Sequence, residues 1–279
     1  MATTLLLRFP AHVVRPTVEK AVGRLFSMGE KFRTFDWIEL FYTDSGQGEP
    51  LIMLHGFTGS SRLDWVETGV FDRMNKCGRR LIMLDARGHG ESDKPHEPLS
   101  YSGRAMARDV NALARHLGLE SYDLVGYSMG ARVAVETALM FRGPRSLVLA
   151  GFQMRDTYWQ WNKAERRAKA RNMLADNPKS MCNARARAER SGGDRKALAA
   201  WIEGVIVPEY SPADLARVKR PVLVVNGEDD PDAESVAGCF RDGKAVVLDT
   251  PHKDILRDKA FPRHTLSFLK KVTVGNGEG

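Results

Sequence analysis

The stretch LVGYSMGARVAVETAL, residues 124–139, decides the fold. The apolar run at 122–126 has the composition of a buried strand, and residues 131–141 carry apolar side chains at helical spacing. Between them, residues 126–130 match the pattern G-x-S-x-G. A sharp strand-to-helix turn leaves no room for side chains beside the serine and lifts its oxygen clear of the sheet. The stretch therefore predicts that Ser128 is a nucleophile at the N-terminus of a helix.

Other apolar runs of strand length recur along the chain. They are IELFY (38–42), PLIML (50–54), RLIML (80–84), SLVLA (146–150), PVLVV (221–225) and AVVLD (245–249). They are rich in Val, Ile and Leu and do not alternate with polar residues, which is typical of strands buried on both faces. Helical patterns lie between them, for example over residues 103–119. The alternation predicts an α/β fold with a mainly parallel central sheet covered by helices on both faces.

Residues 152–219 interrupt this rhythm because they are too long for an ordinary crossover. They are rich in Ala, Arg and Lys, with breaks at 177–178, 191–193 and 211–212, so they predict several short helices. Ligands bind at the carboxyl ends of strands in such sheets, so a helical insertion there would form a lid. The predicted organisation is a core (31–151 and 220–279), a lid (152–219) and an N-terminal extension (1–30).

The N-terminal extension has apolar residues at helical spacing over 18–26, which predicts a short helix docked on the body or on a partner subunit, as in a homodimer. It has no hydrophobic region followed by a cleavage site, so a secretory signal is not expected. No apolar run approaches the ~20 residues that span a bilayer, and no integral membrane association is predicted.

Cysteine and charge content bound the function further. Cys77, Cys182 and Cys239 are scattered, which favours a reducing, cytoplasmic location and argues against a disulfide framework or a zinc site. The net charge is +7, and residues 152–219 hold 14 Lys and Arg against 8 Asp and Glu. Acidic residues are interleaved and no nucleic-acid motif occurs, so a solvated helical face is expected and nucleic-acid binding is not. The surplus still favours acidic substrates or an anionic surface.

A nucleophilic serine needs a base and a group that orients the base, in the chain order Ser, acid, His. Asp230 lies just past the carboxyl end of a predicted strand, with Asp229 as the nearest rival. His252 lies in a turn after the last predicted strand. His264 falls in a terminal helical pattern and is interpreted as a surface residue. The predicted catalytic residues are therefore Ser128, Asp230 and His252.

Two donors are also needed for the oxyanion of the tetrahedral intermediate. One is the backbone N–H of Met129, the residue after the nucleophile. The second is the N–H of Phe57 in the loop LHGFTGSS, where Gly56 lets the chain turn back toward the serine. His55 is interpreted as bracing this loop.

Taken together, these motifs make the chain resemble the α/β-hydrolase superfamily over residues 32–272, in its serine esterase, lipase and peroxidase-like branch. The motifs that carry the resemblance are HGFTGS (55–60), DARGHGESDKP (85–95), GYSMGA (126–131), GEDDP (227–231) and TPHKDIL (250–256). The resemblance implies that residues 87–90 form a structural turn and that His89 is not catalytic. It also implies the acid at Asp230 and excludes the branches with an aspartate nucleophile. The loop at 55–60 differs from the Gly-Gly and Trp type of proline iminopeptidase-like members.

The expected activity is hydrolysis of a small or medium-sized carboxylic ester through an acyl-enzyme on Ser128, without metal or organic cofactor. A lactonase, a thioesterase or a perhydrolase would use the same three residues. A hydrolase fold that serves as a small-molecule receptor with little turnover is the alternative from another class. Thr58, Trp159, Trp161 and Trp201 are candidate pocket residues, and the tryptophans would equally serve to pack the inserted helices onto the body.

Overall fold

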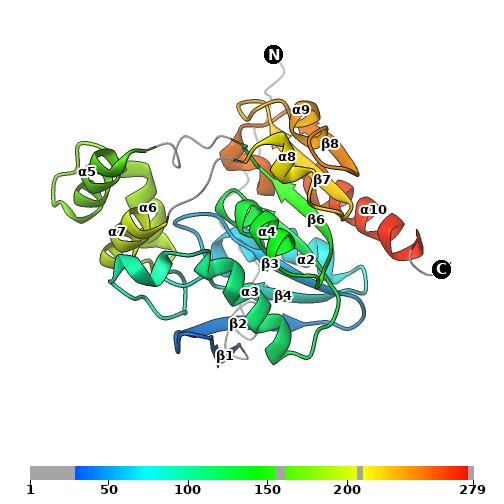
Figure 1. Ribbon diagram of the computed structural model, residues 1–279, viewed down its shortest axis with the longest axis horizontal. Coiled ribbons are helices and arrows are strands. Elements are labelled where there is room, and N and C mark those ends of the chain that lie inside the picture. The colour runs from blue at the N-terminus through cyan, green and yellow to red at the C-terminus, as the bar shows by residue number, and fades with distance from the viewer. Residues whose placement is uncertain (1–28, 155–160, 206–209, 276–279) are drawn as a thin grey trace, which may run out of the picture.

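The computed structural model describes residues 29–154, 161–205 and 210–275. One sheet organises this part of the chain, with the strand order β1-β2-β4-β3-β5-β6-β7-β8 (Figure 1). The strands are β1 (Glu30–Arg33), β2 (Glu39–Ser45), β3 (Pro50–Leu54), β4 (Arg80–Leu84), β5 (Tyr122–Tyr127), β6 (Pro144–Ala150), β7 (Val222–Gly227) and β8 (Gly243–Leu248).

Strands β3 to β8 are parallel to one another, whereas β2 is antiparallel to both β1 and β4. The predicted, mainly parallel sheet is confirmed, and every predicted strand is present within three residues of its expected bounds. The sequence did not predict β1, a short edge strand with only Phe32 buried.

Helices cover both faces of the sheet, as predicted. On one face α3 (Ala105–His116), α4 (Met129–Met140) and α9 (Ala233–Ala237) pack against the strands. On the other face α2 (Val70–Asn75) and α10 (Ala260–Gly275) do so. Each face thus has its own apolar core, and the sheet between them holds the strand ends that carry the site.

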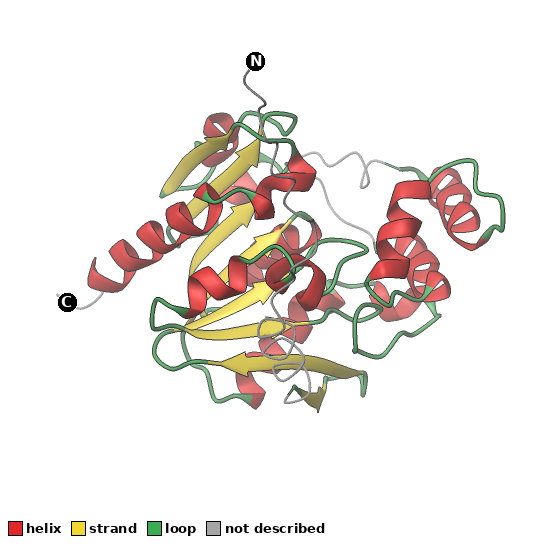
Figure 2. Cartoon of the chain, turned by 180° about the vertical axis from the view of Figure 1, so that it is seen from behind, coloured by secondary structure: helices red, strands yellow, loops and turns green. Residues whose placement is uncertain are grey.

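The insertion forms α5 (Lys163–Leu174), α6 (Cys182–Arg190) and α7 (Arg195–Gly204), which gather in a separate group beside the core (Figures 1 and 2). We call these three the inserted helices. Asn162 starts α5 with a capping box, because its side chain accepts from the N–H of Glu165 while the Glu165 carboxylate accepts from the N–H of Asn162. The short α8 (Pro212–Leu215) follows, and the predicted breaks fall between these helices.

Three short helical turns complete the described chain: η1 (Arg62–Val66), η2 (Pro98–Tyr101) and η3 (His252–Arg257). The helix predicted in the N-terminal extension and the candidate pocket residue Trp159 lie outside the described residues. In the part of the chain that is described, no helix is long and apolar enough to cross a membrane.

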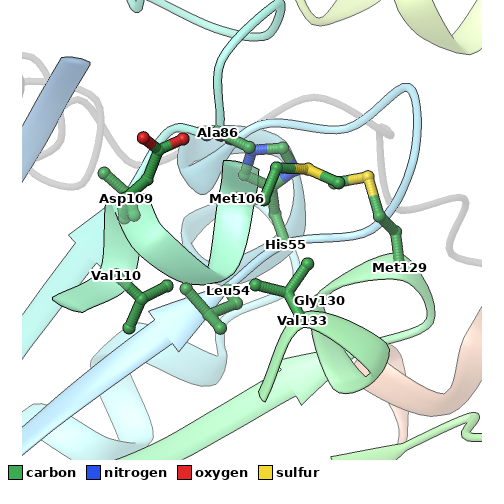
Figure 3. Close-up of a pocket in the computed structure, with 10 residues that line it drawn as sticks. Leu54, His55, Ala86, Met106, Asp109, Val110, Met129, Gly130 and Val133 are labelled. Atoms are coloured by element: carbon green, nitrogen blue, oxygen red, sulfur yellow. Dashed lines mark hydrogen bonds between the residues drawn. The ribbon is translucent and has the colours of Figure 1, made fainter. Parts of the chain in front are cut away.

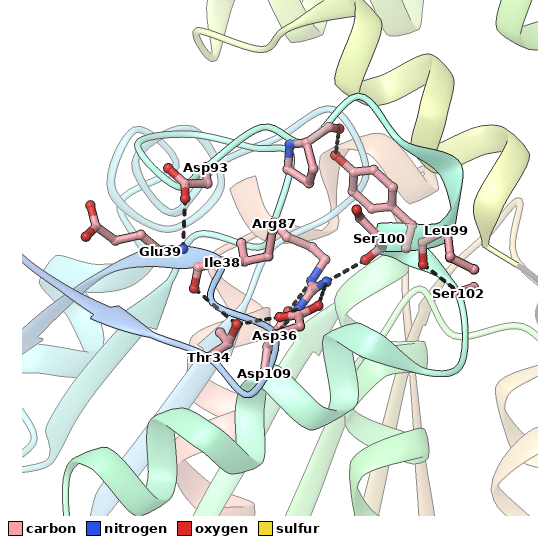
Figure 4. A network of polar contacts seen from close by, with 12 residues as sticks. Thr34, Asp36, Ile38, Glu39, Arg87, Asp93, Leu99, Ser100, Ser102 and Asp109 are labelled. Atoms are coloured by element: carbon pink, nitrogen blue, oxygen red, sulfur yellow. Dashed lines mark hydrogen bonds and ion pairs between the residues drawn. The ribbon is translucent and has the colours of Figure 1, made fainter.

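The loop after β4 is held by a buried ion-pair network (Figure 4). Arg87 is fully buried, and its guanidinium donates to Asp109 at 2.6 and 2.7 Å and to Asp36 at 2.8 Å. Burial alone would lower the pKa of Arg87, but hydrogen bonds and charges from the two carboxylates outweigh it and raise that pKa. The network ties the turn between β1 and β2 to α3, which fits the structural role implied for residues 87–90.

Candidate active site

Ser128 stands at a strained turn between β5 and α4. Its φ of 52° and ψ of −110° are unusual for a residue with a side chain. A Cβ on Gly126 would lie 2.2 Å from the carbonyl oxygen of Gly130, and one on Gly130 would lie 2.0 Å from that of Leu54. The backbones therefore approach so closely that only glycine fits on either side of Ser128, which explains the G-x-S-x-G pattern.

The structure brings the three predicted side chains together from loops far apart in sequence. Nε2 of His252 lies 3.1 Å from Oγ of Ser128, and Nδ1 of His252 lies 2.7 Å from Oδ1 of Asp230. The Asp230 side chain is fully buried. A carboxylate can only accept, so these partners assign the imidazole proton to Nδ1. Nε2 is then the acceptor that faces the serine hydroxyl.

The Asp230 carboxylate has further donors. The backbone N–H of Gly227 donates to Oδ2 at 3.0 Å, and the side-chain amide of Gln153 donates to Oδ1 at 3.0 Å. Burial would raise the pKa of Asp230, but the hydrogen bond and charge of His252, together with these donors, bring it below the usual value. Asp230 is therefore ionised at neutral pH. Nothing in the sequence pattern pointed to Gln153.

The backbone of His252 is fixed by two other residues. Its N–H donates to the Asp229 carboxylate, and its carbonyl accepts from the hydroxyl of Tyr127 at 3.1 Å. The two neighbouring aspartates thus have different partners, because Asp230 contacts the imidazole and Asp229 contacts the main chain. The sequence analysis missed Tyr127, although it occupies the variable position just before Ser128.

The loop that carries Phe57 is held on both sides of Gly56. The N–H of Gly56 donates to Oδ2 of Asp64 at 2.8 Å. Nε2 of His55 accepts from the N–H of Ala86 at 3.0 Å, so the proton lies on Nδ1, which donates to the carbonyl of Gly56 at 2.8 Å. This fixes the plane of the peptide that ends in the Phe57 N–H. His55 braces the loop, as the sequence indicated.

The other predicted donor is the N–H of Met129, the first residue of α4. The first N–H groups of a helix have no acceptor within the helix, and the helix dipole favours negative charge there. Phe57 and Met129 both line the cavity that Ser128 lines. The two predicted donors and the serine therefore share one space.

That space is a cavity of about 290 Å³. Its described lining residues are Gly56, Phe57, Thr58, Tyr127, Ser128, Met129, Asn183, Ala184, Arg187, Trp201, His252 and Lys253. Trp201 of α7 is 3% exposed and stacks on Phe57 with ring centroids 4.2 Å apart, and Thr58 lies beside them. Two of the candidate pocket residues, Thr58 and Trp201, thus line the cavity.

Trp161, the other described candidate, is not among the residues that line this cavity. It precedes α5 and packs partly buried against the core, with Nζ of Lys169 5.2 Å from its ring centroid. Its position near the start of the insertion suggested that it lies close to the strand ends. In the structure, Trp161 lies next to the first of the inserted helices.

An ion pair joins the inserted helices to the loop of Phe57. The guanidinium of Arg187, on α6, contacts Oδ1 of Asp64, whose other oxygen holds the N–H of Gly56. The Asp64 side chain is 2% exposed and that of Arg187 is 28% exposed. The sequence analysis missed this pair because its members are 123 positions apart.

A second cavity lies behind the site, lined by α3, α4 and the ends of β3 and β4 (Figure 3). Its volume is about 20 Å³, and its lining is apolar apart from His55 and Asp109. That is room for little more than one water molecule. Ser128 and His252 do not line it, so the larger cavity is the candidate substrate site.

A strand-turn-helix serine, an acid after β7 and a histidine after β8, on a mainly parallel eight-stranded sheet, define the α/β-hydrolase class of fold. A family model described as alpha/beta hydrolase fold matches residues 49–152. The chain has this fold, and the family model supports assigning residues 49–152 to the α/β-hydrolase superfamily.

Several proteins of known sequence are similar to this chain. The AB hydrolase superfamily protein YisY of Bacillus subtilis is 37% identical over 108 residues, which are 39% of this chain and 38% of that protein. A proline iminopeptidase of Clostridium botulinum is 31% identical over 150 residues, which are 53% of this chain and 48% of that protein. The chain thus spans less than half the length of these relatives. The similarity to a proline iminopeptidase was not expected, because the loop at 55–60 lacks the Gly-Gly and Trp composition of such proteins.

Solved structures are similar over most of the chain. An esterase from Exiguobacterium antarcticum has a TM-score of 0.72 and 22% identity, and covers 87% of this chain and 100% of its own. An enol-lactonase from Burkholderia xenovorans has a TM-score of 0.68 and 21% identity, and covers 86% of this chain and 100% of its own. At these identities the likeness establishes the fold.

Proposed function

We propose that the protein is a serine hydrolase that cleaves a carboxylic ester through an acyl-enzyme on Ser128. The observation that carries the proposal is the unbroken line of contacts from Oγ of Ser128 to His252 at 3.1 Å and on to buried Asp230 at 2.7 Å. A nucleophile, a base and a group that orients the base are the parts that acyl transfer to serine requires.

In the first half of the reaction, Oγ of Ser128 attacks the ester carbonyl and its proton passes to Nε2 of His252. The ionised Asp230 stabilises the imidazolium that forms. The tetrahedral oxyanion is held by the N–H groups of Phe57 and Met129. His252 then gives the proton to the departing alkoxide, which leaves as an alcohol, and the acyl group remains on Ser128.

In the second half, a water molecule takes the place of the alcohol. His252 accepts a proton from it as it attacks the acyl carbonyl, and returns the proton to Oγ of Ser128 when the acid leaves. The cavity of about 290 Å³ lies at the small end of ligand sites, which typically measure ~300–1,000 Å³. This size favours small or medium-sized acyl groups.

The charges of the cavity favour an ester over the N-terminus of a peptide. A free α-amino group is largely cationic at neutral pH. Among the described lining residues, Arg187 and Lys253 are cationic and none is acidic. An amino-terminal substrate, of the kind that the name of the proline iminopeptidase implies for that relative, would therefore meet like charge here.

Steady-state turnover of p-nitrophenyl esters from acetate to octanoate tests the proposal. We expect sustained hydrolysis, with kcat/KM highest for the shorter acyl chains. A stoichiometric burst without turnover, or no reaction at all, would instead support a receptor. Cleavage of prolyl p-nitroanilide without cleavage of any ester would identify a peptidase.

A further inference from the structure

The wall of the candidate substrate cavity carries an uneven distribution of charge. Arg187 and Lys253 line it from opposite parts of the chain, one on α6 and one directly after His252. Asn183, one turn before Arg187 on α6, adds a neutral amide to the same wall. Within the lining that the structure describes there is no carboxylate.

Arg187 is held in place by a carboxylate that lies behind the wall. Asp64 is almost fully buried, and its Oδ1 contacts only one of the guanidinium nitrogens, Nη2. A guanidinium has five N–H donors in a fixed planar arrangement, so this contact orients the group while leaving donors for a ligand. Asp64 also balances the charge of Arg187.

The surplus positive charge therefore comes from Lys253. Its side chain is exposed, and in the described chain it forms no salt bridge within 4 Å. Lys253 directly follows the proposed base and lines the same cavity as Ser128, so an anion that it attracts is drawn into that cavity. The inserted segment adds to this field, because residues 152–219 hold six more basic than acidic residues.

We propose that the cavity selects esters whose acyl part carries a carboxylate, that is, monoesters of short dicarboxylic acids. The carboxylate is bound between Arg187 and Lys253, while the ester carbonyl lies against Ser128 and the N–H groups of Phe57 and Met129. A guanidinium with a nearby ammonium matches the two oxygens of a carboxylate. This inference rests on the proposed function, because it names the substrate class of the same site.

The test compares two p-nitrophenyl esters: mono-p-nitrophenyl glutarate, which is an anion, and its methyl ester, in which a methyl group masks the carboxylate. We expect kcat/KM of the wild-type protein to favour the anionic ester about tenfold or more, as one charge-assisted hydrogen bond provides. The preference should shrink as salt is added, because screening weakens the attraction of exposed charges.

Lys253→Gln should lower the ratio of the two kcat/KM values about tenfold, and Lys253→Glu should invert the preference. Lys270→Gln is the matched control, since this exposed lysine lies on α10 and does not line the cavity. A wild-type ratio near one, or equal losses for both esters in Lys253→Gln, would overturn the inference.

A binding measurement separates this inference from the proposed function. Isothermal titration of the Ser128→Ala variant with monomethyl glutarate and with dimethyl glutarate needs no turnover. If neither p-nitrophenyl ester is hydrolysed but the monoanion binds and Lys253→Gln weakens its binding about tenfold, the anion site is supported and ester hydrolysis is contradicted. If both p-nitrophenyl esters are hydrolysed alike and monomethyl glutarate binds no more tightly than dimethyl glutarate, the proposed hydrolysis is supported and the anion site is contradicted.

Discussion

A methyl group on Gly151 would lie 2.5 Å from Cε1 of His252, closer than carbon atoms approach without bonding. Gly151 follows β6 with a φ of +62°, and its N–H donates to the carbonyl of Val225 at 2.9 Å. The end of one strand thus provides the space in which the imidazole lies. The position of His252 depends on this absence of a side chain as well as on Asp230.

We therefore predict that Gly151→Ala displaces the imidazole and lowers kcat/KM about a hundredfold, since small misplacements of catalytic groups have costs of this order. Gly118→Ala is the control, because Gly118 also has a positive φ, of +65°, but no atom lies within 4 Å of the added Cβ. It should lose about 1 kcal/mol of stability from backbone strain and keep its activity. Equal effects on activity in the two variants would show that His252 tolerates the methyl group.

Substitution of the two neighbouring aspartates, Asp230 and Asp229, should lower kcat to very different extents. Asp230→Asn should lower kcat about 10⁴-fold, because the amide no longer selects the imidazole tautomer with its proton on Nδ1. Asp229→Asn should cost less than about tenfold, since the amide oxygen can still accept the N–H of His252. Steady-state kinetics on both variants decides the matter. The opposite ranking would move the acid to Asp229.

The tryptophans of the insertion test whether the inserted helices shape the substrate site. Trp201→Ala removes the ring that stacks on Phe57 and lines the cavity, so we expect KM and the preference for acyl length to change. Trp161→Ala should lower the melting temperature and leave the order of substrates as it was. A shifted substrate profile in the Trp161 variant alone would reverse these assignments.

His89 packs against His55 and Phe57 and makes the stability of the protein depend on acid. Burial, with smaller contributions from His55 and Lys94, lowers the pKa of His89 to about 3. Between pH 6.5 and 3 the unfolded chain binds a proton there that the folded chain does not, so this residue makes stability fall as pH falls. His89→Gln should remove up to about 1.4 kcal/mol per pH unit from that slope.

Denaturant unfolding from pH 7 down to pH 4 measures the slope. His264→Gln, at an exposed position on α10, is the control and should give a curve parallel to that of the wild type. Parallel curves for His89→Gln and the wild type would show that His89 already binds its proton in the folded protein.

The sequence sufficed for the parts of the molecule that depend on local pattern. Strands buried on both faces are continuous apolar runs, so their positions were predictable, and Ser128, Asp230 and His252 follow strands at fixed offsets. Strand β1 was not predictable, because a four-residue edge strand is defined by its pairing with β2 and has little apolar character.

Contacts between distant segments also escaped prediction. Arg187 and Asp64 meet only once the inserted helices have folded back onto the core, and no local pattern encodes that approach. It was likewise not predictable that Trp201 lines the cavity whereas Trp161 does not, since composition identifies an aromatic cluster but not where each side chain lies. Local pattern thus identified the three side chains that the structure brings together, whereas the candidate substrate cavity required the tertiary structure.

The most direct test of the account is to react the protein with a fluorophosphonate and locate the adduct by mass spectrometry of its peptides. The account predicts one adduct per chain, on Ser128, and none on a folded Ser128→Ala variant, which should also lose ester hydrolysis while keeping the circular dichroism spectrum of the wild type. An adduct that persists in the folded Ser128→Ala variant, or ester hydrolysis that survives in it, would contradict the account.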